Sequence, residues 1–287
     1  LGDLDPYQSA LHAVDEALRN IVAVGGNLER TAILDNFCWG NCNKPDRMGA
    51  LVRSAQACRD AAMVYSVPFV SGKDSLNNEF QTDDGQTIAI PYTLLISAIS
   101  VVPDTTLCVT SDAKTPGNLL YLLGETRAEL GGSHVLRAEG IESGNDVPPV
   151  DLAGNLQTMQ ALQRAIANKL VRSCHDLSEG GLAVTAAEMA FAGGLGMELS
   201  LANVPTAEGF PEGEKPIACI AKLFGESAGR FLVEVTPENK DAFEAMVADI
   251  PVGEIGKVTD TGRVVIDKFI DLAINDAKSA WQGTFAW

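Results

Sequence analysis

The chain has 287 residues, of which 46% are hydrophobic, and it carries a formal net charge of −17 at neutral pH. The length suits one large domain or two of ordinary size, and the hydrophobic content excludes a disordered chain. Because so acidic a surface repels polyanions, we expect no general binding of nucleic acid. An anionic ligand would need backbone N–H groups, a helix N-terminus or a bound cation around it.

The N-terminal part of the sequence predicts helices and strands with clear boundaries. Asp5 is a good helix N-cap, Pro6 suits the first helical position, and apolar residues recur at helical spacing until Gly25 and Gly26 end the pattern. A second amphipathic helix is predicted over residues 44–67. Strands are predicted over residues 30–37, 68–70 and 88–102, with a hairpin turn at residues 83–85.

The composition changes to Pro, Thr, Asp and Gly around residues 103–118, so we place a boundary between domains 1–111 and 112–287. Helices and strands are mixed beyond it without strict alternation, which favours an α+β fold. Helices are predicted over residues 152–170, 182–194 and 238–250, and strands over 119–124, 171–174, 197–202, 230–235, 251–258 and 263–268.

The six cysteines are scattered, and only Cys38 and Cys42 lie close together. Without a second pair or a histidine cluster they do not form a zinc pattern, so we interpret them as thiols of a reduced, cytoplasmic protein. No apolar stretch is long enough to cross a bilayer, and we expect no membrane partner. The chain starts without Met and ends abruptly, so we expect a processed chain or a piece of a longer one.

The segment "SGKDS", Ser71–Ser75, contains half of a phosphate-binding P-loop pattern. A P-loop has a glycine five residues before its Gly-Lys pair, and here that position is Val67. The pattern therefore excludes a P-loop and predicts a strand-to-loop turn that carries Gly72, Lys73, an acid and a hydroxyl. A plain polar hairpin is the alternative interpretation.

Two further groups have the chemistry of a metal or ligand site. Glu16 and Asn20 lie four residues apart on one helix face, where a carboxylate and an amide oxygen suit Mg²⁺; an exposed polar stripe is the alternative. Asp35 and Asn36 lie at a strand end, where ligand-binding side chains often collect; an Asx-turn is the alternative.

The loop "HDLSEGG", His175–Gly181, joins an apolar strand to a helix of small residues. Its glycine pair would let the backbone approach a phosphate at the helix N-terminus, and Asp176 could hold a metal that bridges phosphates. The alternative interpretation is structural, with Ser178 as an ordinary N-cap of the helix.

Five segments together, and in this order, resemble the second half of the phosphoribosylformylglycinamidine (FGAM) synthases. They are "AVDEALRNIVAVGG", "LDNFCWGN", "PFVSGKDSLNNEF", "HDLSEGGLAVTAAEMAF" and "FGESAGRFLVEV". These enzymes are related to aminoimidazole ribonucleotide (AIR) synthetase. The resemblance implies an N-terminal domain whose sheet forms a half-barrel, an α/β sandwich as C-terminal domain, and two such halves related by a pseudo-twofold axis.

The resemblance also implies a ligase reaction of purine biosynthesis. ATP phosphorylates the formyl amide oxygen of formylglycinamide ribonucleotide (FGAR), and glutamine-derived ammonia then displaces phosphate to give the amidine. The implied partners are FGAR, the first half of the synthetase and a glutaminase subunit or domain. The family's catalytic histidines lie in that first half, so we assign no catalytic residue here. We expect the chain alone to be inactive and to form a homodimer through the pseudo-twofold face.

Residue roles carry over by position. Asp35 and Gly72 match residues that bind ATP, and Ser75 matches one that contacts the substrate. Lys73 stands where the related small-type enzymes have a metal-binding Asn; because a cation cannot ligate Mg²⁺, we assign Lys73 to direct phosphate contact.

An auxiliary nucleotide site is implied as well. Glu16, Asn20 and Asp176 match residues that hold Mg²⁺ beside ADP or ATP, and Ser178 matches one that contacts this nucleotide. The alternatives are another ATP-dependent enzyme of the AIR synthetase superfamily, such as selenophosphate synthetase or thiamine-phosphate kinase, and a non-catalytic module that binds ADP and Mg²⁺.

Overall fold

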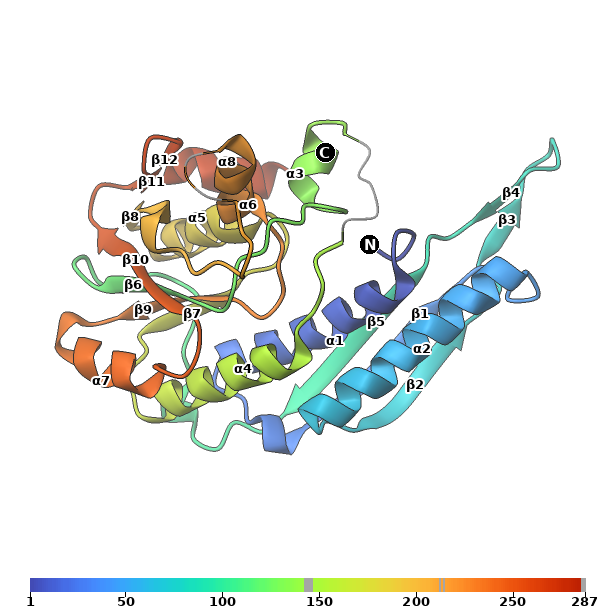
Figure 1. Ribbon diagram of the computed structural model, residues 1–287, viewed down its shortest axis with the longest axis horizontal. Helices are drawn as coiled ribbons and strands as arrows, with labels where there is room; N and C mark the ends of the chain where they lie inside the picture. The colour runs from blue at the N-terminus through green and yellow to red at the C-terminus, as the bar shows by residue number, and fades with distance from the viewer. Residues whose placement is uncertain (142–146, 212, 214, 285–287) are drawn as a thin grey trace.

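The computed structural model describes residues 1–141, 147–211, 213 and 215–284 (Figure 1). The N-terminal elements are α1 Pro6–Ala23, β1 Thr31–Cys38, α2 Pro45–Tyr65, β2 Phe69–Ser75, β3 Glu79–Gln81, β4 Thr87–Ala89 and β5 Thr93–Ser100. The C-terminal elements are β6 Leu119–Leu123, α3 His134–Ala138, α4 Leu152–Ala167, β7 Ser173–Asp176, α5 Gly181–Gly193, β8 Gly196–Leu199, α6 Pro216–Phe224, β9 Phe231–Val235, α7 Lys240–Met246, β10 Val252–Thr259, β11 Arg263–Ile266, β12 Ile270–Ala273 and α8 Ile274–Gly283. This mixture confirms the predicted α+β class.

The first helix begins and ends as its sequence predicts. The Asp5 side chain accepts hydrogen bonds from the backbone N–H groups of Tyr7 and Gln8, and Pro6 occupies the first helical position. Gly25 follows the helix at φ 97°, a conformation that glycine adopts without steric cost. The direction of α1 is therefore fixed at both ends, which matters because α1 carries several candidate site residues.

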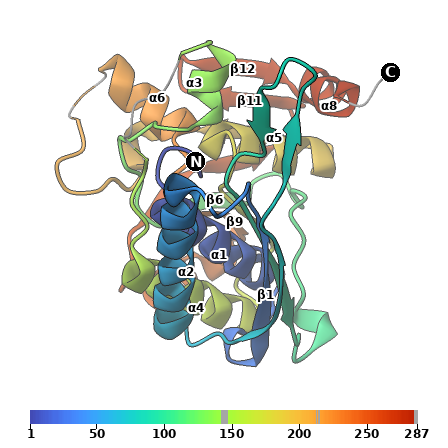
Figure 2. The ribbon, with the colours of Figure 1, turned by 90° about the vertical axis from the view of Figure 1, so that its right-hand side faces the viewer.

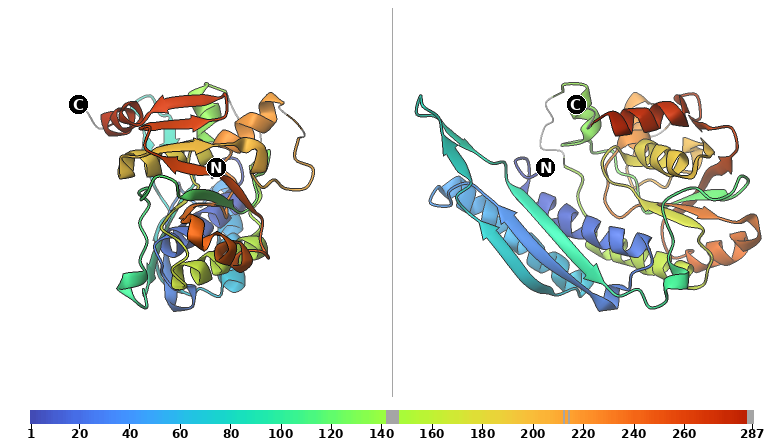
Figure 3. Two further views of the ribbon diagram at one scale, coloured as in Figure 1. Left: turned by 90° about the vertical axis from the view of Figure 1, so that its left-hand side faces the viewer. Right: turned by 180° about the vertical axis from the view of Figure 1, so that it is seen from behind.

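In the described part of the chain, helices cover one face of the N-terminal sheet and leave the other open. Its strand order is β2-β1-β5, with β1 parallel to β2 and antiparallel to β5. Figure 1 shows α1 and α2 lying across the sheet, and the view from behind in Figure 3 shows the strands with no described helix over them. Alternate residues of β5 accordingly differ, since Leu94 and Ile96 pack into the core whereas Leu95 and Ile99 are 58% and 65% exposed. The sheet is an open half-barrel layer.

The interpretation of Ser71–Ser75 as a strand-to-loop turn is wrong. Strand β2 runs to Ser75, and its residues pair with β1 in parallel register, Gly72 opposite Asp35 and Lys73 opposite Asn36. The backbone hydrogen bonds to β1 hold this polar segment extended. The predicted turn at residues 83–85 is confirmed, because it joins β3 and β4 into the hairpin that projects from the N-terminal unit (Figures 1 and 2).

The C-terminal sheet is covered on both faces. Within the described residues its strand order is β12-β11-β8-β10-β6-β9-β7. Side chains of β6 alternate between two cores: Leu120 and Leu122 join the one that contains α5, whereas Tyr121 and Leu123 join the one that contains α4. This layering confirms the predicted sandwich.

The second of these cores also joins the two units. Helix α1 packs against α2, α4 and β7, so one apolar cluster extends from the N-terminal helices to the C-terminal sheet. The domain boundary at residues 111 and 112 stays a prediction. Every helix in the described ranges is too short or too polar to span a lipid bilayer.

Candidate functional site

A polar cavity of about 320 Å³ lies where α1 meets the loop that opens α5. The residues around it come from α1, from the loop before α3 and α3 itself, and from the segments before α5 and after α6. They include Ser9, His12, Glu16, Arg19, Gly132, His134, Arg137, Ser178, Glu179 and Glu226. The fold thus brings the α1 group and the "HDLSEGG" loop together, as the interpretation of both as one site requires.

The carboxylate of Glu16 faces this cavity in a strongly negative environment. Burial raises the pKa of Glu16, and the negative charges of Glu179 and Asp176 raise it further. A cation bound here would relieve that repulsion. Asn20 lies one helical turn further along α1 and is exposed, so of the predicted α1 pair only Glu16 lines the cavity.

Asp176 ends β7 and is 4% exposed. Burial works to raise its pKa, but the hydrogen bond with His175, the positive charge of Arg19 and the hydrogen bond from Ser178 outweigh it, so the pKa lies below the usual value. The Ser178 hydroxyl donates to Asp176 Oδ2 at 2.6 Å. Asp176 is therefore held as a carboxylate immediately behind the cavity wall.

The predicted metal-ligand set fits Mg²⁺ only with help from a ligand. Within the described ranges no three His, Cys, Asp or Glu side chains converge as a ready cluster. Mg²⁺ commonly keeps several waters and binds through one or two carboxylates together with substrate phosphates. Glu16 and Asp176 can supply those carboxylates, and phosphate oxygens and water would complete the shell.

The loop before α5 depends on its two glycines. Gly180 and Gly181 have φ values of 79° and 60°, and a Cβ at residue 181 would lie 2.5 Å from the carbonyl oxygen of Gly225. Gly180 is the N-cap of α5, so the alternative interpretation of Ser178 as the N-cap is not observed. The Gly180 N–H donates to Glu226 Oε1 at 2.9 Å, and an anionic ligand at this helix start would compete with that carboxylate.

Sequence reasoning missed His134, Arg137 and Glu226 as cavity residues, and it gave His12 no role beyond its shared helix face. Glu226 also accepts the His134 N–H at 2.8 Å, so it ties the loop before α3 to the start of α5. His12 Nε2 donates to the Pro148 carbonyl oxygen at 2.9 Å, and burial lowers the pKa of His12, so its ring packs in the neutral form. These residues come from distant segments, and no local spacing marks them.

The residues predicted at strand ends form a second, separate group within β1 and β2, because β1 continues past Asp35 and Asn36 to Cys38 and neither lies in a turn. Asp35 lies two positions from the buried Ile33 and Phe37, so its side chain points to the same, helix-covered face of the sheet. Burial there raises the pKa of Asp35. Its carboxylate lies over Gly72, because a Cβ at residue 72 would be 2.4 Å from Asp35 Oδ1.

The other two predicted strand residues lie on the opposite face. Lys73 and Ser75 are two positions apart on β2, and the Lys73 ammonium donates to the Ser75 hydroxyl. The structure therefore separates the predicted set into Asp35 with Gly72 and Lys73 with Ser75. One ligand could contact both pairs only around the end or edge of the sheet.

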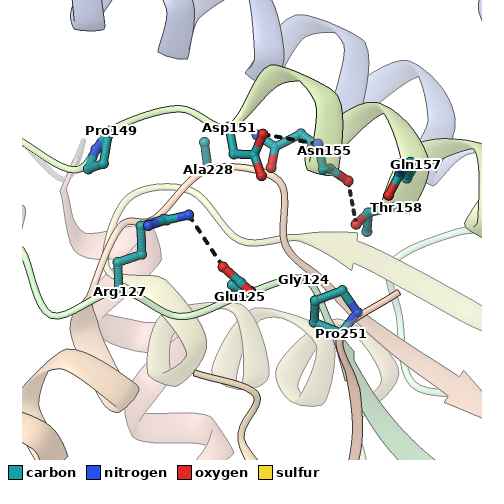
Figure 4. Close-up of a pocket in the computed structure, with 11 residues that line it drawn as sticks. Gly124, Glu125, Arg127, Pro149, Asp151, Asn155, Gln157, Thr158, Ala228 and Pro251 are labelled. Carbon is teal, nitrogen blue, oxygen red and sulfur yellow. Dashed lines mark hydrogen bonds and ion pairs between the residues drawn. The ribbon is translucent and has the colours of Figure 1, made fainter. Parts of the chain in front are cut away.

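A smaller cavity of about 190 Å³ lies between α4, the loop after β6 and the residue before β10, Pro251 (Figure 4). Its charged groups are engaged with neighbours: Arg127 Nη2 lies 3.3 Å from Glu125 Oε2, and Asp151 caps α4 by accepting the Gly154 N–H. Asn155 on its wall points inward to Asp15. We therefore place the candidate site in the cavity between α1 and the loop before α5.

Comparison with known proteins identifies the fold family. A family model described as "AIR synthase related protein, C-terminal domain" matches residues 115–268, and one described as "AIR synthase related protein, N-terminal domain" matches residues 2–96. The chain belongs to the AIR synthase related proteins. Both domains of that family are present and occur in the expected order.

Three solved structures have the same fold at low sequence identity. Thermotoga maritima PurL complexed with FGAR is 19% identical with a TM-score of 0.75, and the match covers 96% of this chain and 43% of that one. Phosphoribosylformylglycinamidine synthase II from Thermotoga maritima matches at 19% identity and a TM-score of 0.72, over 96% of this chain and 42% of that one. The hydrogenase maturation protein HypE in complex with ATP is 17% identical with a TM-score of 0.64, over 90% of this chain and 75% of that one. This AIR synthase related chain thus spans less than half of the PurL chain.

Proposed function

We propose that this chain is one half of an FGAM synthase and that the cavity between α1 and the loop before α5 binds ADP or ATP together with Mg²⁺. Glu16 and Ser178 line one cavity, and Asp176 accepts the Ser178 hydroxyl directly behind its wall; this arrangement is the observation that carries the proposal. The ordered set of motifs supports the family member, and the resemblance to structures described as PurL with ATP, with ADP and with FGAR agrees with it.

Each cavity residue would have its own role in binding a nucleotide. Mg²⁺, when bound, would neutralise phosphate charge that the negative surface of Glu16 and Asp176 otherwise repels. Ser178 would position the phosphates, and the positive side chain of Arg137 on α3 would add attraction. His12, held neutral by burial, would pack against the ligand without adding charge.

We propose that the β1 and β2 residues bind other ligands of the same enzyme. Asp35 and Gly72 would contact a second ATP, Lys73 its phosphates, and Ser75 the FGAR substrate. The reaction would be the ATP-dependent amidation of FGAR with ammonia from a glutaminase. The structure described as PurLQS from Thermotoga maritima supports an assembly with further subunits.

The open face of the N-terminal sheet would bind the first half of the synthetase. It exposes Leu95 and Ile99, and the projecting hairpin exposes Phe80 and Ile88 at 65% and 59%. Exposed apolar side chains gathered on one sheet face are typical of an interface. Without that half, a second copy of the chain would cover the face, and the chain alone would not turn over substrate.

Titration calorimetry tests the proposal. We expect ADP to bind in the presence of Mg²⁺ and Asp176→Ala to weaken Mg²⁺-dependent binding by at least about tenfold, as loss of a ligand-site carboxylate does. Asp271→Ala is the matched control, because that carboxylate is 66% exposed on β12. Equal affinity of the wild type and Asp176→Ala, or no binding by either, would contradict the proposal.

A turnover assay separates this half from a complete enzyme. Incubated with ATP, ammonia and FGAR, the chain alone should release no amidine product above background. An appreciable rate would show that the chain needs no first half.

HypE supports a second candidate, another ATP-dependent enzyme of the superfamily. The match spans 75% of the HypE chain in complex with ATP, a larger share than for PurL. The two candidates share nucleotide binding and differ in substrate. FGAR binding distinguishes them. Saturable binding of FGAR when the chain is mixed with a first-half synthetase, and no FGAR binding when the chain is mixed with a HypE-type partner, would favour FGAM synthase.

A further inference from the structure

Helix α1 carries a buried ion pair directly beside its two predicted ligand-binding residues. Asp15 and Arg19 are 0% and 3% exposed and are four residues apart, the same spacing as Glu16 and Asn20 one position along. A buried charged pair is retained only where hydrogen bonds satisfy it, because taking either charge out of water is costly.

Asp15 is immobilised by three elements besides α1. Its carboxylate accepts hydrogen bonds from Tyr65 Oη of α2 at 2.5 Å, from Asn155 Nδ2 of α4 at 2.8 Å and from the Gly229 N–H at 3.2 Å. Figure 4 shows Asn155 on α4. With Arg19 Nη1 as a fourth donor, the carboxylate is anchored to both units of the chain.

Arg19 extends from that anchor to the loop before α5. Its Nη2 donates to Ser178 Oγ at 3.1 Å and lies 3.4 Å from the Leu177 carbonyl oxygen. Its Nε lies 3.8 Å from Asp176 Oδ2 and makes no hydrogen bond, although it is buried. The planar guanidinium is therefore held on one edge by Asp15 and supports the Asp176–Ser178 segment with the other.

We propose that Arg19, fixed by Asp15, is a positioning residue for the nucleotide site: it orients Ser178, and through Ser178 the carboxylate of Asp176, toward the cavity. The hydroxyl of Ser178 accepts from Arg19 and donates to Asp176, so one chain of contacts runs from Asp15 to the predicted metal ligand. The charge of Arg19 also offsets the repulsion among Asp15, Glu16 and Asp176, which surround it. This inference rests on the proposed function for its ligand but not for its geometry.

Hydrogen exchange of the ligand-free protein tests the geometry. In Arg19→Met, which keeps side-chain volume and removes the fork, we expect the amides of residues 177–181 to exchange at least about tenfold faster while those of β9 keep their protection. Tyr65→Phe is the matched control, because it removes a different donor to Asp15 and leaves the guanidinium in place. Unchanged exchange at residues 177–181 in a folded Arg19→Met would overturn the inference.

If Arg19→Met does not fold, hydrogen exchange of Arg19→Lys tests the same inference. One ammonium group cannot engage Asp15 and Ser178 in the same forked geometry, so loop exchange should still rise. Wild-type protection in Arg19→Lys would overturn the inference.

Ligand binding then separates positioning from general stability. Arg19→Met should weaken ADP in the presence of Mg²⁺ about tenfold or more, as loss of groups that orient metal ligands typically does. In a Ser178→Ala background the same substitution should have a much smaller effect, because the contact that transmits it is already absent. Strictly additive effects would contradict action through Ser178. If the wild type binds no nucleotide, the proposed function fails, and hydrogen exchange still decides the role of Arg19.

Discussion

Glu234 should be a stability determinant at the junction between the segment after β5 and the C-terminal sheet. It lies on β9 and is 0% exposed. Its Oε1 accepts from the Thr115 N–H at 3.1 Å and from Asn118 Nδ2 at 2.6 Å. Its Oε2 accepts from the Lys114 N–H at 2.9 Å and from Ser173 Oγ at 2.8 Å.

The substitution Glu234→Gln places an NH₂ group where one carboxylate oxygen accepted two hydrogen bonds. The Ser173 hydroxyl can rotate to accept, but the Lys114 N–H cannot, so one buried donor loses its acceptor. A hydrogen bond to a charged group contributes about 1.5–3 kcal/mol. With about 2.1 cal/mol/K of unfolding entropy per residue over 287 residues, such a loss lowers the melting temperature by about 3–5 °C.

Differential scanning calorimetry measures this shift directly. Glu198→Gln is the control, because Glu198 is 60% exposed and pairs with Lys257 at the surface; it should change the melting temperature by less than about 1 °C. A melting temperature of Glu234→Gln within 1 °C of the wild type would refute the reasoning that this carboxylate anchors the segment.

Three further predictions follow from packing and exposure. Gly72→Ala should destabilise the fold by about 1–3 kcal/mol in urea unfolding, because its Cβ would overlap the Asp35 carboxylate. Gly49→Ala is the control and should be neutral or stabilising, because Gly49 lies in an exposed turn of α2 with open space around it. Ile99→Glu should convert a concentration-dependent dimer of the isolated chain into a monomer in sedimentation, because it adds a charge to the open sheet face. Burial raises the pKa of Cys58 to about 12, so at pH 8 only about one thiol in ten thousand there is ionised and a thiol reagent should label it only after unfolding, unlike the exposed Cys108.

Each of these has a control or a contrary outcome. For the sheet face, Val52→Glu is a matched charge on the exposed side of α2 and should leave the association unchanged; dissociation by both variants would contradict an interface on the sheet. Equal destabilisation by the two glycine substitutions would contradict the close approach of Asp35 to Gly72. Rapid labelling of Cys58 in the native protein would contradict its burial.

The sequence predicted those elements whose boundaries are encoded locally. Helix α1 was placed well because Asp5, Pro6 and Gly25 mark its ends and apolar residues recur at helical spacing between them. Strand β2 was assigned too short because its residues "SGKDS" are polar and turn-like. Its extended form depends on pairing with β1, which lies far away in sequence.

The sequence predicts the chemical groups of the candidate site but not all of the residues that line it. Glu16, Asp176 and Ser178 are recognisable from carboxylate and hydroxyl groups in suitable local patterns; in the fold Glu16 and Ser178 line one cavity, and Asp176 is hydrogen-bonded to Ser178 behind its wall. Glu226 was missed because it reaches the start of α5 from the segment after α6. The pair of Asp15 and Arg19 interrupts the apolar face of α1 at a spacing of four, and that interruption was the available signal for it.

A crystal structure of the chain grown with ADP and Mn²⁺ in place of Mg²⁺ is the most direct test of the nucleotide site. The account predicts nucleotide density between α1 and the loop before α5, with an anomalous metal peak bound by Glu16 and Asp176. Nucleotide seated only at Gly72 and Lys73 on the sheet, or a metal peak away from Asp176, would contradict it.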